Sequence, residues 1–436
     1  MPTAPHSLDA ERLWADVMAL AAITDPNRPY TRQSFSPLFL EGRAWLARQF
    51  AAAGLAVRID AAGNLIGRLG GENPELGVLA IGSHSDTVPS GGRFDGIAGV
   101  ATGLEVARAL RDASVRLDHS LEVIDFLAEE PSDYGLSCVG SRGMSGALAP
   151  QMLEMKEPGG ETLGEALRRV GGNPDALSAA RRADIKAFLE LHIEQGSVLE
   201  AQSLPVGIVT AIAGIRRVAI TFEGAADHAG TIPMEMRHDA LVAAANTVIS
   251  VRRAAERLAG EGAGYFVATV GVLTVDPGAP NVVPAKCRMV IDIRTTVLAL
   301  TERFTEAVER ESAQHADNAR VARSSLEILS DGPPVDCDVE LRAKLKRSAG
   351  TLGLRSSELA SGAGHDAAFM TRMCPSAMVF VPCRHGKSHT PEEWADRDAI
   401  AAGAAVILDT IKLLDQTLPR TASHATLDDR SGGARG

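Results

Sequence analysis

The pattern of hydrophobic and polar residues predicts helices and strands in regular succession. Apolar residues recur with a helical period over Leu8–Ala22, with Ser7 as a candidate N-cap, and over Leu38–Ala53, which Gly54 would end. Short apolar runs bounded by turn residues predict strands at 55–59, 64–67, 78–81, 120–127 and 187–193. Helices are expected at 99–113 and 161–170, and a Gly- and Ser-rich loop at 135–146. This alternation is typical of a mostly parallel sheet covered by helices on both faces.

A second pattern begins after Pro205. Strands are expected at 218–222, 265–274, 288–294 and 324–329, with helices at 239–258 and 301–314. Their order is typical of a split βαβ (ferredoxin-like) module with one open sheet face. The first pattern then returns, with helices at 340–352 and 397–414 and a strand at 377–381.

We therefore expect an α/β protein with an inserted domain. A mostly parallel mixed sheet would be built by residues 1–212 and 330–418, interrupted by an α+β domain at 213–329. Residues 419–436 are polar and rich in Gly and Ser, so they are expected to be disordered.

Composition narrows the possible partners and location. The net charge of −11 argues against a surface for nucleic acid or anionic membranes. The five cysteines are odd in number and form no CxxC pair, so they indicate neither a disulfide framework nor a thiolate zinc site. No segment reaches the roughly 18 apolar residues of a membrane span, and the N-terminus lacks a basic start. We expect a soluble protein of the reducing cytoplasm.

Two candidate metal ligands lie in one glycine-rich loop. His84 follows the apolar run 77–81, so its imidazole is expected at the carboxyl end of a buried strand, where open α/β sheets bind ligands. Asp95 follows eleven residues later, and the glycines between the two allow tight turns. Asp86 could accept a hydrogen bond from the other nitrogen of His84 and fix its tautomer. A single histidine in such a loop could also be ordinary surface.

Further candidate ligands lie where other predicted strands give way to loops. They are the pair Glu129 and Glu130, His192, and His389. Because strand ends of one sheet meet at one crevice, these distant residues are expected to converge there. Imidazoles with carboxylates suit zinc, manganese, cobalt or nickel. If Asp95 bridges two ions, these would lie about 3.5–4 Å apart, as in two-metal hydrolases.

The adjacent glutamates are expected to have different roles. Neighbouring side chains at a strand end point in different directions, so one ion cannot easily bind both. We assign Glu130 as a ligand and Glu129 as a general base that takes a proton from water and returns it to a leaving nitrogen. The alternative is a solvated strand end without chemistry, since charged residues are mostly exposed.

The motifs together resemble those of one enzyme family. The chain contains, in this order, GSHSDTV, GGRFDGIAGV, AEEPSDYG, ELHIEQG, DHAGTIPM, PNVVPAKC, SGAGHDA and GKSHTPEEW. This series is similar to the hydantoinase/carbamoylase branch of the dinuclear aminopeptidase-acylase superfamily. That branch includes N-carbamoyl-L-amino-acid hydrolases, allantoate and ureidoglycolate amidohydrolases, and β-ureidopropionases.

The resemblance implies a dinuclear metal site and a base. Two divalent ions (Zn²⁺, Mn²⁺, Co²⁺ or Ni²⁺) would be bound, with Glu129 as the base and Asp95 as the bridging ligand. The implied ligands are His84, Asp95, Glu130, His192 and His389.

The resemblance also implies a homodimer and a set of substrate contacts. The inserted domain would pair through its sheet and lend His228 to the partner's active site, where it would bind substrate and stabilise an oxyanion. Asn281 and Arg294 match positions that hold the substrate carboxylate, and the remaining implied substrate contacts are Gln195, Gly364 and His365. From the residues alone, His228 could equally be a turn residue, and Arg294 could form a structural pair with Asp292.

The expected function is therefore metal-dependent hydrolysis of a non-peptide carbon–nitrogen bond. The substrate would be a small acid such as an N-carbamoyl-L-amino acid, allantoate, ureidoglycolate or N-carbamoyl-β-alanine. An aminopeptidase, a dipeptidase or an N-acyl-amino-acid hydrolase of the same fold is the alternative enzyme. A non-catalytic dimeric binding protein is disfavoured because it would not need Glu129 beside a ligand.

Overall fold

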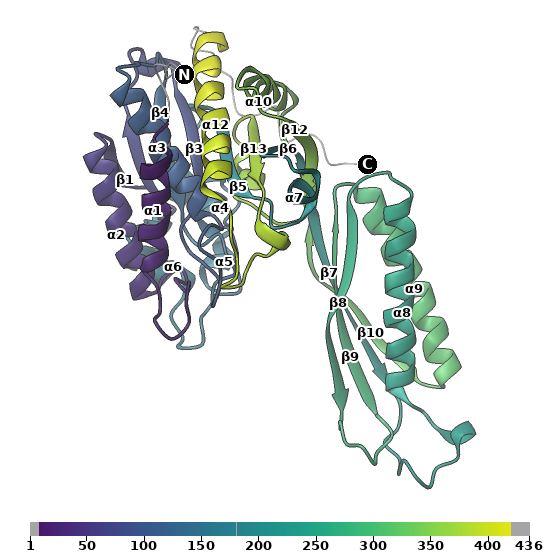
Figure 1. Cartoon of the computed structure of the whole chain (residues 1–436). Coiled ribbons are helices and arrows are strands. Elements are labelled where there is room, and N and C mark those ends of the chain that lie inside the picture. The colour runs from purple at the N-terminus through teal and green to yellow at the C-terminus, as the bar shows by residue number, and fades with distance from the viewer. Residues whose placement is uncertain (1–7, 180, 420–436) are drawn as a thin grey trace. The chain divides into compact units, whose positions relative to one another are not determined.

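The computed structural model describes residues 8–179 and 181–419, which form two compact units (Figure 1). The second unit comprises Ala211–Asp336 and Ala360–Gly364, and the first comprises the other described residues. The expected insertion, 213–329, ends too early because β10 (Ala322–Gly332) and β11 (Val335–Asp336) extend the unit. Strand β11 pairs with Ala211 and Ile212. Ser7 and residues 420–436 of the expected tail lie outside the described residues.

The first unit is organised around one mixed sheet. Its strand order is β1-β2-β4-β3-β5-β13-β6, and β12 also pairs with β6. The four central strands, β4, β3, β5 and β13, are parallel, whereas β1, β2 and β6 pair in antiparallel fashion. The strands are β1 (Ala56–Ile59), β2 (Leu65–Leu69), β3 (Val78–His84), β4 (Ser120–Phe126), β5 (Ile185–Ile193), β6 (Val206–Ile212), β12 (Ser356–Ser361) and β13 (Ser376–Val381).

Helices cover both faces of this sheet. Helices α1, α3 and α12 pack against one another on one face (Figure 1). On β5, Leu191 packs against Gly403 of α12, while the carboxylate of the preceding residue, Glu190, accepts a hydrogen bond from the backbone of Ala367 in α11. Since successive strand residues point to opposite faces, α11 lies on the other face. The helices are α1 (Ala10–Ala22), α2 (Pro37–Ala52), α3 (Ile97–Asp112), α4 (Val139–Ser145), α5 (Pro150–Leu153), α6 (Leu163–Arg169), α7 (Val198–Gln202), α10 (Val339–Thr351), α11 (Ala367–Met370) and α12 (Arg397–Thr417).

The main difference from the sequence pattern is helix α4. The prediction of a loop at 135–146 was wrong for Val139–Ser145, because the glycines there serve close packing. Gly140 donates its N–H to the carbonyl of Leu127 at 2.8 Å, and a β-carbon at Gly140 would overlap the side chain of Asn64. Tertiary contact thus overrides weak helix propensity. At the start of the chain, Asp9 rather than Ser7 caps α1, because its carboxylate accepts a hydrogen bond from the backbone of Arg12.

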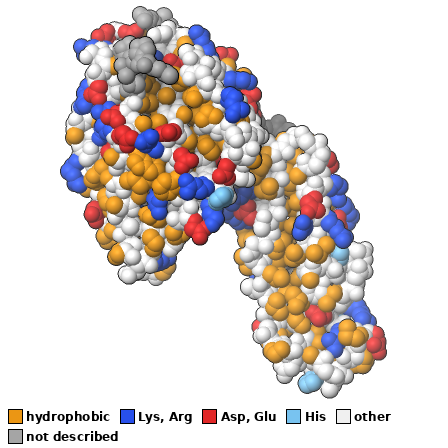
Figure 2. Space-filling model, viewed as in Figure 1, with side chains coloured by type: hydrophobic (Ala, Val, Ile, Leu, Met, Phe, Trp, Pro, Cys, Tyr) orange, Lys and Arg blue, Asp and Glu red, His pale blue; other side chains and the backbone are white. Residues whose placement is uncertain are grey.

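The second unit is a four-stranded antiparallel sheet with two helices. The sheet order is β10-β7-β9-β8. Buried residues of β7 and β9 form a core with α8 and α9, whereas hydrophobic side chains of β8 and β10 remain exposed, among them Val272, Leu273 and Ile328. Hydrophobic side chains gather over the strands of this unit (Figure 2). Its elements are β7 (Gly214–Glu223), α8 (Ala240–Gly260), β8 (Phe266–Asp276), β9 (Lys286–Thr295), α9 (Leu298–Ala319) and β10.

The helices of the described chain carry no membrane signal. None of those within residues 8–179 and 181–419 combines the length and apolar character needed to cross a bilayer.

Candidate metal centre

The parallel strands of the first unit bring the candidate ligands to one edge of the sheet. His84 is the last residue of β3, and His192 is the last but one of β5. Glu129 and Glu130 follow β4, and His389 lies in the loop after β13. Because β4, β3, β5 and β13 are adjacent and parallel, their carboxyl ends share one edge.

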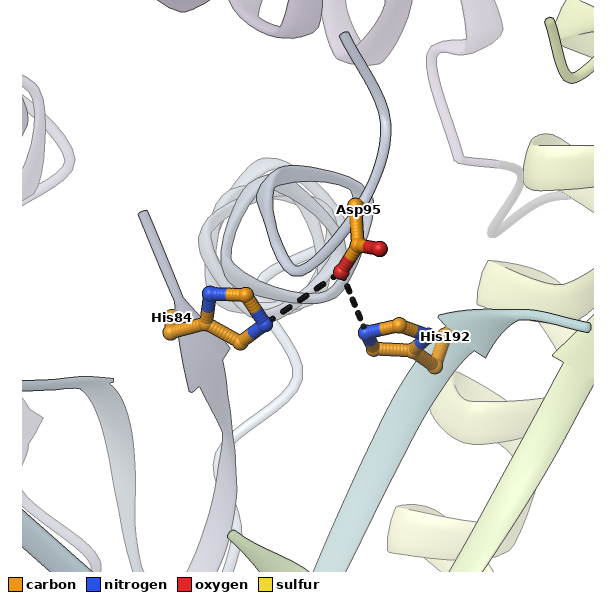
Figure 3. Close-up of side chains that lie close together, drawn as sticks. All are labelled: His84, Asp95 and His192. Carbon is orange, nitrogen blue, oxygen red and sulfur yellow. Dashed lines mark ion pairs between the residues drawn. The ribbon is translucent and has the colours of Figure 1, made fainter. Parts of the chain in front are cut away.

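The first cluster is His84, Asp95 and His192. The Nε2 atoms of His84 and His192 lie 3.5 and 3.1 Å from Oδ1 of Asp95 (Figure 3). All three side chains are buried, and their ligand atoms lie within 4.8 Å of one another.

The second cluster shares Asp95 with the first. Nε2 of His389 lies 3.2 Å from Oδ2 of Asp95 and 3.2 Å from Oε1 of Glu130. The two oxygens of Asp95 therefore face different clusters, Oδ1 toward two histidines and Oδ2 toward His389. This is the placement that a carboxylate needs in order to bridge two ions.

Hydrogen bonds leave a lone pair on each Nε2 of the first cluster. Nδ1 of His84 lies 3.1 Å from the carbonyl oxygen of Asp86, and Nδ1 of His192 lies 2.9 Å from that of Ile193. A carbonyl can only accept, so each Nδ1 carries the hydrogen and each neutral ring presents Nε2 unprotonated. The Gly96 N–H donates to Nε2 of His192 at 3.2 Å. Nε2 of His84 is buried without a hydrogen-bond partner among the described residues.

These atoms fit a divalent cation. Two imidazole lone pairs and a carboxylate oxygen meet in a buried space, where they repel one another unless positive charge lies between them. Ligands about 2.0–2.2 Å from a tetrahedral ion lie roughly 3.3 Å from each other, close to the observed 3.1 and 3.5 Å. Nitrogen and carboxylate donors suit zinc, manganese, cobalt or nickel.

The electrostatics also favour a cation. Burial raises the pKa of Glu129 well above its usual value; nearby His84 opposes this shift and the Glu130 carboxylate adds to it. Hydrogen bonds to Asp95 and Glu130 raise the pKa of His389 to about 11. Burial alone would raise the pKa of Asp95, but His192 and the other imidazoles hold it well below its usual value. The carboxylates thus hold positive charge in the site.

Asp86 organises the site differently from expectation. Its backbone carbonyl, rather than its carboxylate, is the nearer partner of His84, since Oδ1 lies at 3.5 Å from Nδ1. The carboxylate instead accepts hydrogen bonds from the backbone N–H groups of Glu129 and Glu130, at 3.3 and 3.2 Å. Asp86 therefore holds the turn on which both glutamates sit.

The two glutamates have different surroundings. Glu130 belongs to the second cluster, whereas Glu129 belongs to neither. Oε2 of Glu129 lies 3.5 Å from Nε2 of His84, and Oε1 lies 3.6 Å from the thiol of Cys138. Glu129 therefore borders the clusters and has an oxygen directed toward them.

Two predicted substrate residues of the first unit lie against the ligands. Nε2 of Gln195 donates to Oδ2 of Asp95 at 2.6 Å. The ring of His365 lies 4.5 Å from the ring of His192, centroid to centroid, and burial lowers its pKa well below the usual value. Together with Glu190, these two histidines form a third group of close ligand atoms. The sequence pattern missed Glu190, whose only signal is its place two residues before His192.

The remaining predicted substrate residues belong to the second unit. His228 pairs with Val282 in a β-bridge, and the carbonyl of the adjacent Asn281 accepts a hydrogen bond from the N–H of Ala229. Gly230 donates its N–H to Nδ1 of His228 at 3.1 Å, which leaves the hydrogen of the neutral ring on Nε2. Gly364 also belongs to this unit.

Arg294 lies at the other end of the sheet from His228 and Asn281. Its guanidinium donates to Asp292 at 2.7 Å and to the carbonyl of Gly362 at 2.9 Å. The His228–Val282 bridge extends the β7–β9 ladder past Lys286, the first residue of β9. Arg294 lies eight positions after Lys286, near the other end of the strand. At about 3.3 Å per residue, roughly 26 Å of strand separates the two ends. One small molecule cannot contact both ends within the same unit.

Comparisons with known proteins agree on one family. The family model described as peptidase family M20/M25/M40 matches residues 80–413. An N-carbamoyl-L-amino acid amidohydrolase of Geobacillus stearothermophilus is 39% identical over 412 residues, which are 94% of this chain and 99% of that protein. A ureidoglycolate hydrolase of Oryza sativa subsp. japonica is 35% identical over 93% of this chain and 84% of its own length. A crystal structure of a hydantoinase/carbamoylase family amidase from Burkholderia multivorans matches with a TM-score of 0.87 and 35% identity, covering 94% of this chain and 98% of that one.

Proposed function

This chain belongs to peptidase family M20/M25/M40 and is a hydrolase of carbon–nitrogen bonds, and on that premise we propose that it hydrolyses a small N-carbamoyl or ureido acid. The observation that carries the proposal is Asp95, whose two oxygens face two ligand clusters beside the buried Glu129. The relatives named for N-carbamoyl amino acids and ureidoglycolate, each matched over most of its length, support this substrate class.

The residues divide the chemistry between them. His84, Asp95 and His192 would hold one divalent ion, and Asp95, Glu130 and His389 the other. Such ions, when bound, polarise a carbonyl and lower the pKa of a water. Glu129 takes the proton of the attacking water and delivers it to the leaving nitrogen. Its burial favours this role, because burial raises the pKa of the carboxyl and so makes the carboxylate a stronger acceptor for the proton of water.

The substrate residues of the second unit support a dimeric active site. His228 presents an Nε2 hydrogen that can stabilise an oxyanion. The guanidinium of Arg294 can donate two parallel hydrogen bonds to a substrate carboxylate. Because Arg294 lies about 26 Å along the strand from the end that carries His228 and Asn281, we assign the two ends to the active sites of different subunits. Substrate would be held by Arg294, Gln195, His365 and Gly364 of one subunit and by His228 and Asn281 of the other.

The second unit offers the surface for such a dimer. Its strand order, β10-β7-β9-β8, supports a ferredoxin-like module, with helices on one face only. The exposed hydrophobic residues of β8 and β10 and the free edges of these strands are prone to pairing. We propose that a two-fold interface between copies of this unit covers them.

Mixing two inactive variants tests the shared site. His228→Ala and Glu129→Gln proteins should each be nearly inactive, but subunit exchange should restore about a quarter of wild-type activity. Random mixing makes half of the dimers heterodimers, and each heterodimer has one intact site of two. Ammonia release before and after exchange measures the recovery, and native mass spectrometry verifies the exchange. No recovery among verified heterodimers would place His228 in its own subunit's site or outside catalysis.

A substrate panel tests the reaction itself. The purified protein would be loaded with Mn²⁺, Zn²⁺, Co²⁺ or Ni²⁺ and given N-carbamoyl-L-amino acids, N-carbamoyl-β-alanine, allantoate and ureidoglycolate. N-acetyl amino acids and dipeptides serve as matched controls for the alternative activities of the same fold. We expect ammonia from at least one member of the first set, with kcat/KM well above that for any control. Faster turnover of N-acetyl amino acids or dipeptides would refute the proposed substrate class.

A further inference from the structure

One buried carboxylate outside the two clusters joins the loops that carry their ligands. Glu393 lies four residues after His389 and is 1% exposed. Its Oε1 accepts hydrogen bonds from two successive backbone N–H groups, those of Phe94 at 2.8 Å and Asp95 at 3.2 Å. The side chain thus reaches across 298 positions of the sequence to the loop that presents Asp95.

A serine completes the connection on the other side. Oγ of Ser388 lies 2.8 Å from Oε2 of Glu393 and 2.8 Å from Oδ2 of Asp95. The Glu393 side chain is therefore linked to Asp95 in two ways. It accepts a hydrogen bond from the backbone N–H of Asp95, and Ser388 connects it to the Asp95 carboxylate. Because a hydroxyl has one hydrogen, Ser388 can donate to only one of the two carboxylates at a time. A glutamine at position 393 could accept from both N–H groups and donate to Ser388, which would satisfy every partner.

Gly92 packs directly against the carboxylate of Glu393. A β-carbon on Gly92 would overlap the carboxyl group of Glu393, which supplies its three nearest atoms. Gly92 does not have the positive φ that would itself require glycine. Glycine is therefore needed here because a side chain would overlap the Glu393 carboxylate, and not because of the backbone conformation.

Aromatic contacts join the same two loops. The ring of Phe94 lies 5.6 Å from that of Trp394, edge to face, and the guanidinium of Arg93 lies 5.1 Å above Trp394. Each of these residues lies within two positions of Asp95 or Glu393. The contacts to Trp394 therefore pack the two loops together near the buried carboxylate.

We propose that Glu393 is a positioning residue that locks the Asp95 loop to the Ser388–His389 loop, so that Asp95 is held between both ligand clusters before any metal binds. The functional importance of this inference rests on the proposed metal centre. The lock itself, meaning the hydrogen bonds of Glu393 to Phe94, Asp95 and Ser388, is a property of the protein without metal. Two backbone hydrogen bonds to one buried side chain fix the position of the Asp95 loop, which suits such a role.

Hydrogen exchange in the metal-free protein tests the lock directly. In Glu393→Ala, the amides of Phe94 and Asp95 lose their acceptor, and we expect their exchange to be at least tenfold faster than in the wild type. Glu393→Gln should keep nearly wild-type exchange. Glu392→Ala is the matched control, because Glu392 is exposed and pairs with Lys387 in the same loop. Unchanged exchange in folded Glu393→Ala would overturn the proposal, as would equally fast exchange in the glutamine variant.

A double substitution provides an independent test. Gly92→Ala should displace Glu393 and cause the same fast exchange, even though Glu393 is still present. In the double variant Gly92→Ala/Glu393→Ala, the new methyl group enters the space that the carboxylate leaves, so the two effects should not add. Full additivity would refute the packing on which the lock depends. Gly92→Ala also serves as the second variant if Glu393→Ala fails to fold.

Metal affinity separates this proposal from the proposed function. A competition titration with Zn²⁺ should show affinity reduced by about 10- to 100-fold in Glu393→Ala and within about twofold of wild type in Glu393→Gln. Unchanged Zn²⁺ affinity in Glu393→Ala would overturn the role in holding Asp95. If the wild type bound Zn²⁺ but hydrolysed no substrate of the panel, the proposed function would fail. The hydrogen-exchange results would still test whether Glu393 positions the Asp95 loop.

Discussion

Replacement of Glu129 by glutamine is expected to lower kcat by about 10²- to 10⁴-fold, the usual contribution of a general base, while metal content stays at the wild-type level. The amide keeps the shape of the side chain but cannot accept a proton from water. Glu129 belongs to neither ligand cluster, and its backbone is held by Asp86, so the substitution should leave both clusters intact. Steady-state ammonia release and metal analysis on the same preparation measure the two effects.

The neighbouring glutamate provides the matched control. Glu130→Gln changes the same functional group one position away, but Glu130 lies in the second cluster, 3.2 Å from His389. It should therefore lose metal as well as activity. A Glu129→Gln protein with less than a tenfold loss of kcat would exclude Glu129 as the base, and one that lost metal in the same proportion as activity would point to a ligand role.

Replacement of Asp95 by alanine is expected to abolish activity by removing both metal ions. Asp95 is the only described residue shared by the cluster with His84 and His192 and the cluster with Glu130 and His389. Its removal takes one ligand from each cluster. The negative charge of the Asp95 carboxylate, which lies between Glu130 and the imidazoles of His84 and His192, is then lost. Metal content per subunit, measured after dialysis against metal-free buffer, should fall from about two to near zero.

Variants confined to one cluster make this prediction specific. His192→Ala should mainly empty the first cluster and His389→Ala the second, so each should retain about one ion per subunit. Circular dichroism would confirm that the variants are folded. Retention of both ions in Asp95→Ala would exclude Asp95 as a bridge, and full occupancy in His192→Ala would exclude His192 as a ligand.

Much of this architecture could be predicted from local patterns. Apolar periodicity and turn residues indicated the central strands and the long helices, because burial of one face imposes a period that a single sequence displays. His84, His192 and the Glu129–Glu130 pair were recognisable because each lies at or just after the end of an apolar run, and parallel strand ends share an edge. The family resemblance added residues such as His228 and Arg294, which local pattern alone left open between functional and structural roles.

Contacts between distant segments could not be predicted in this way. The glycines of α4 were mistaken for loop residues because their partners, Asn64 and Leu127, are remote in sequence. The Asp86 carboxylate, expected to partner His84, does lie 3.5 Å from its Nδ1, but it also accepts hydrogen bonds from the backbone of both glutamates, which no local pattern indicates. Glu393 lies in the GKSHTPEEW motif, but nothing local indicated its role, since its partners lie on a loop almost 300 positions away.

The sequence by itself determined which residue types stand at the ends of which strands, and hence the class of chemistry. Only the tertiary structure decided that Asp95 faces both clusters and that Glu393 holds its loop. It also decided that His228 and Arg294 lie at opposite ends of one sheet. The physical reason is that residue type and period act over a few neighbours. Distances between side chains, in contrast, depend on strand register and on the packing of segments that meet only in the folded chain.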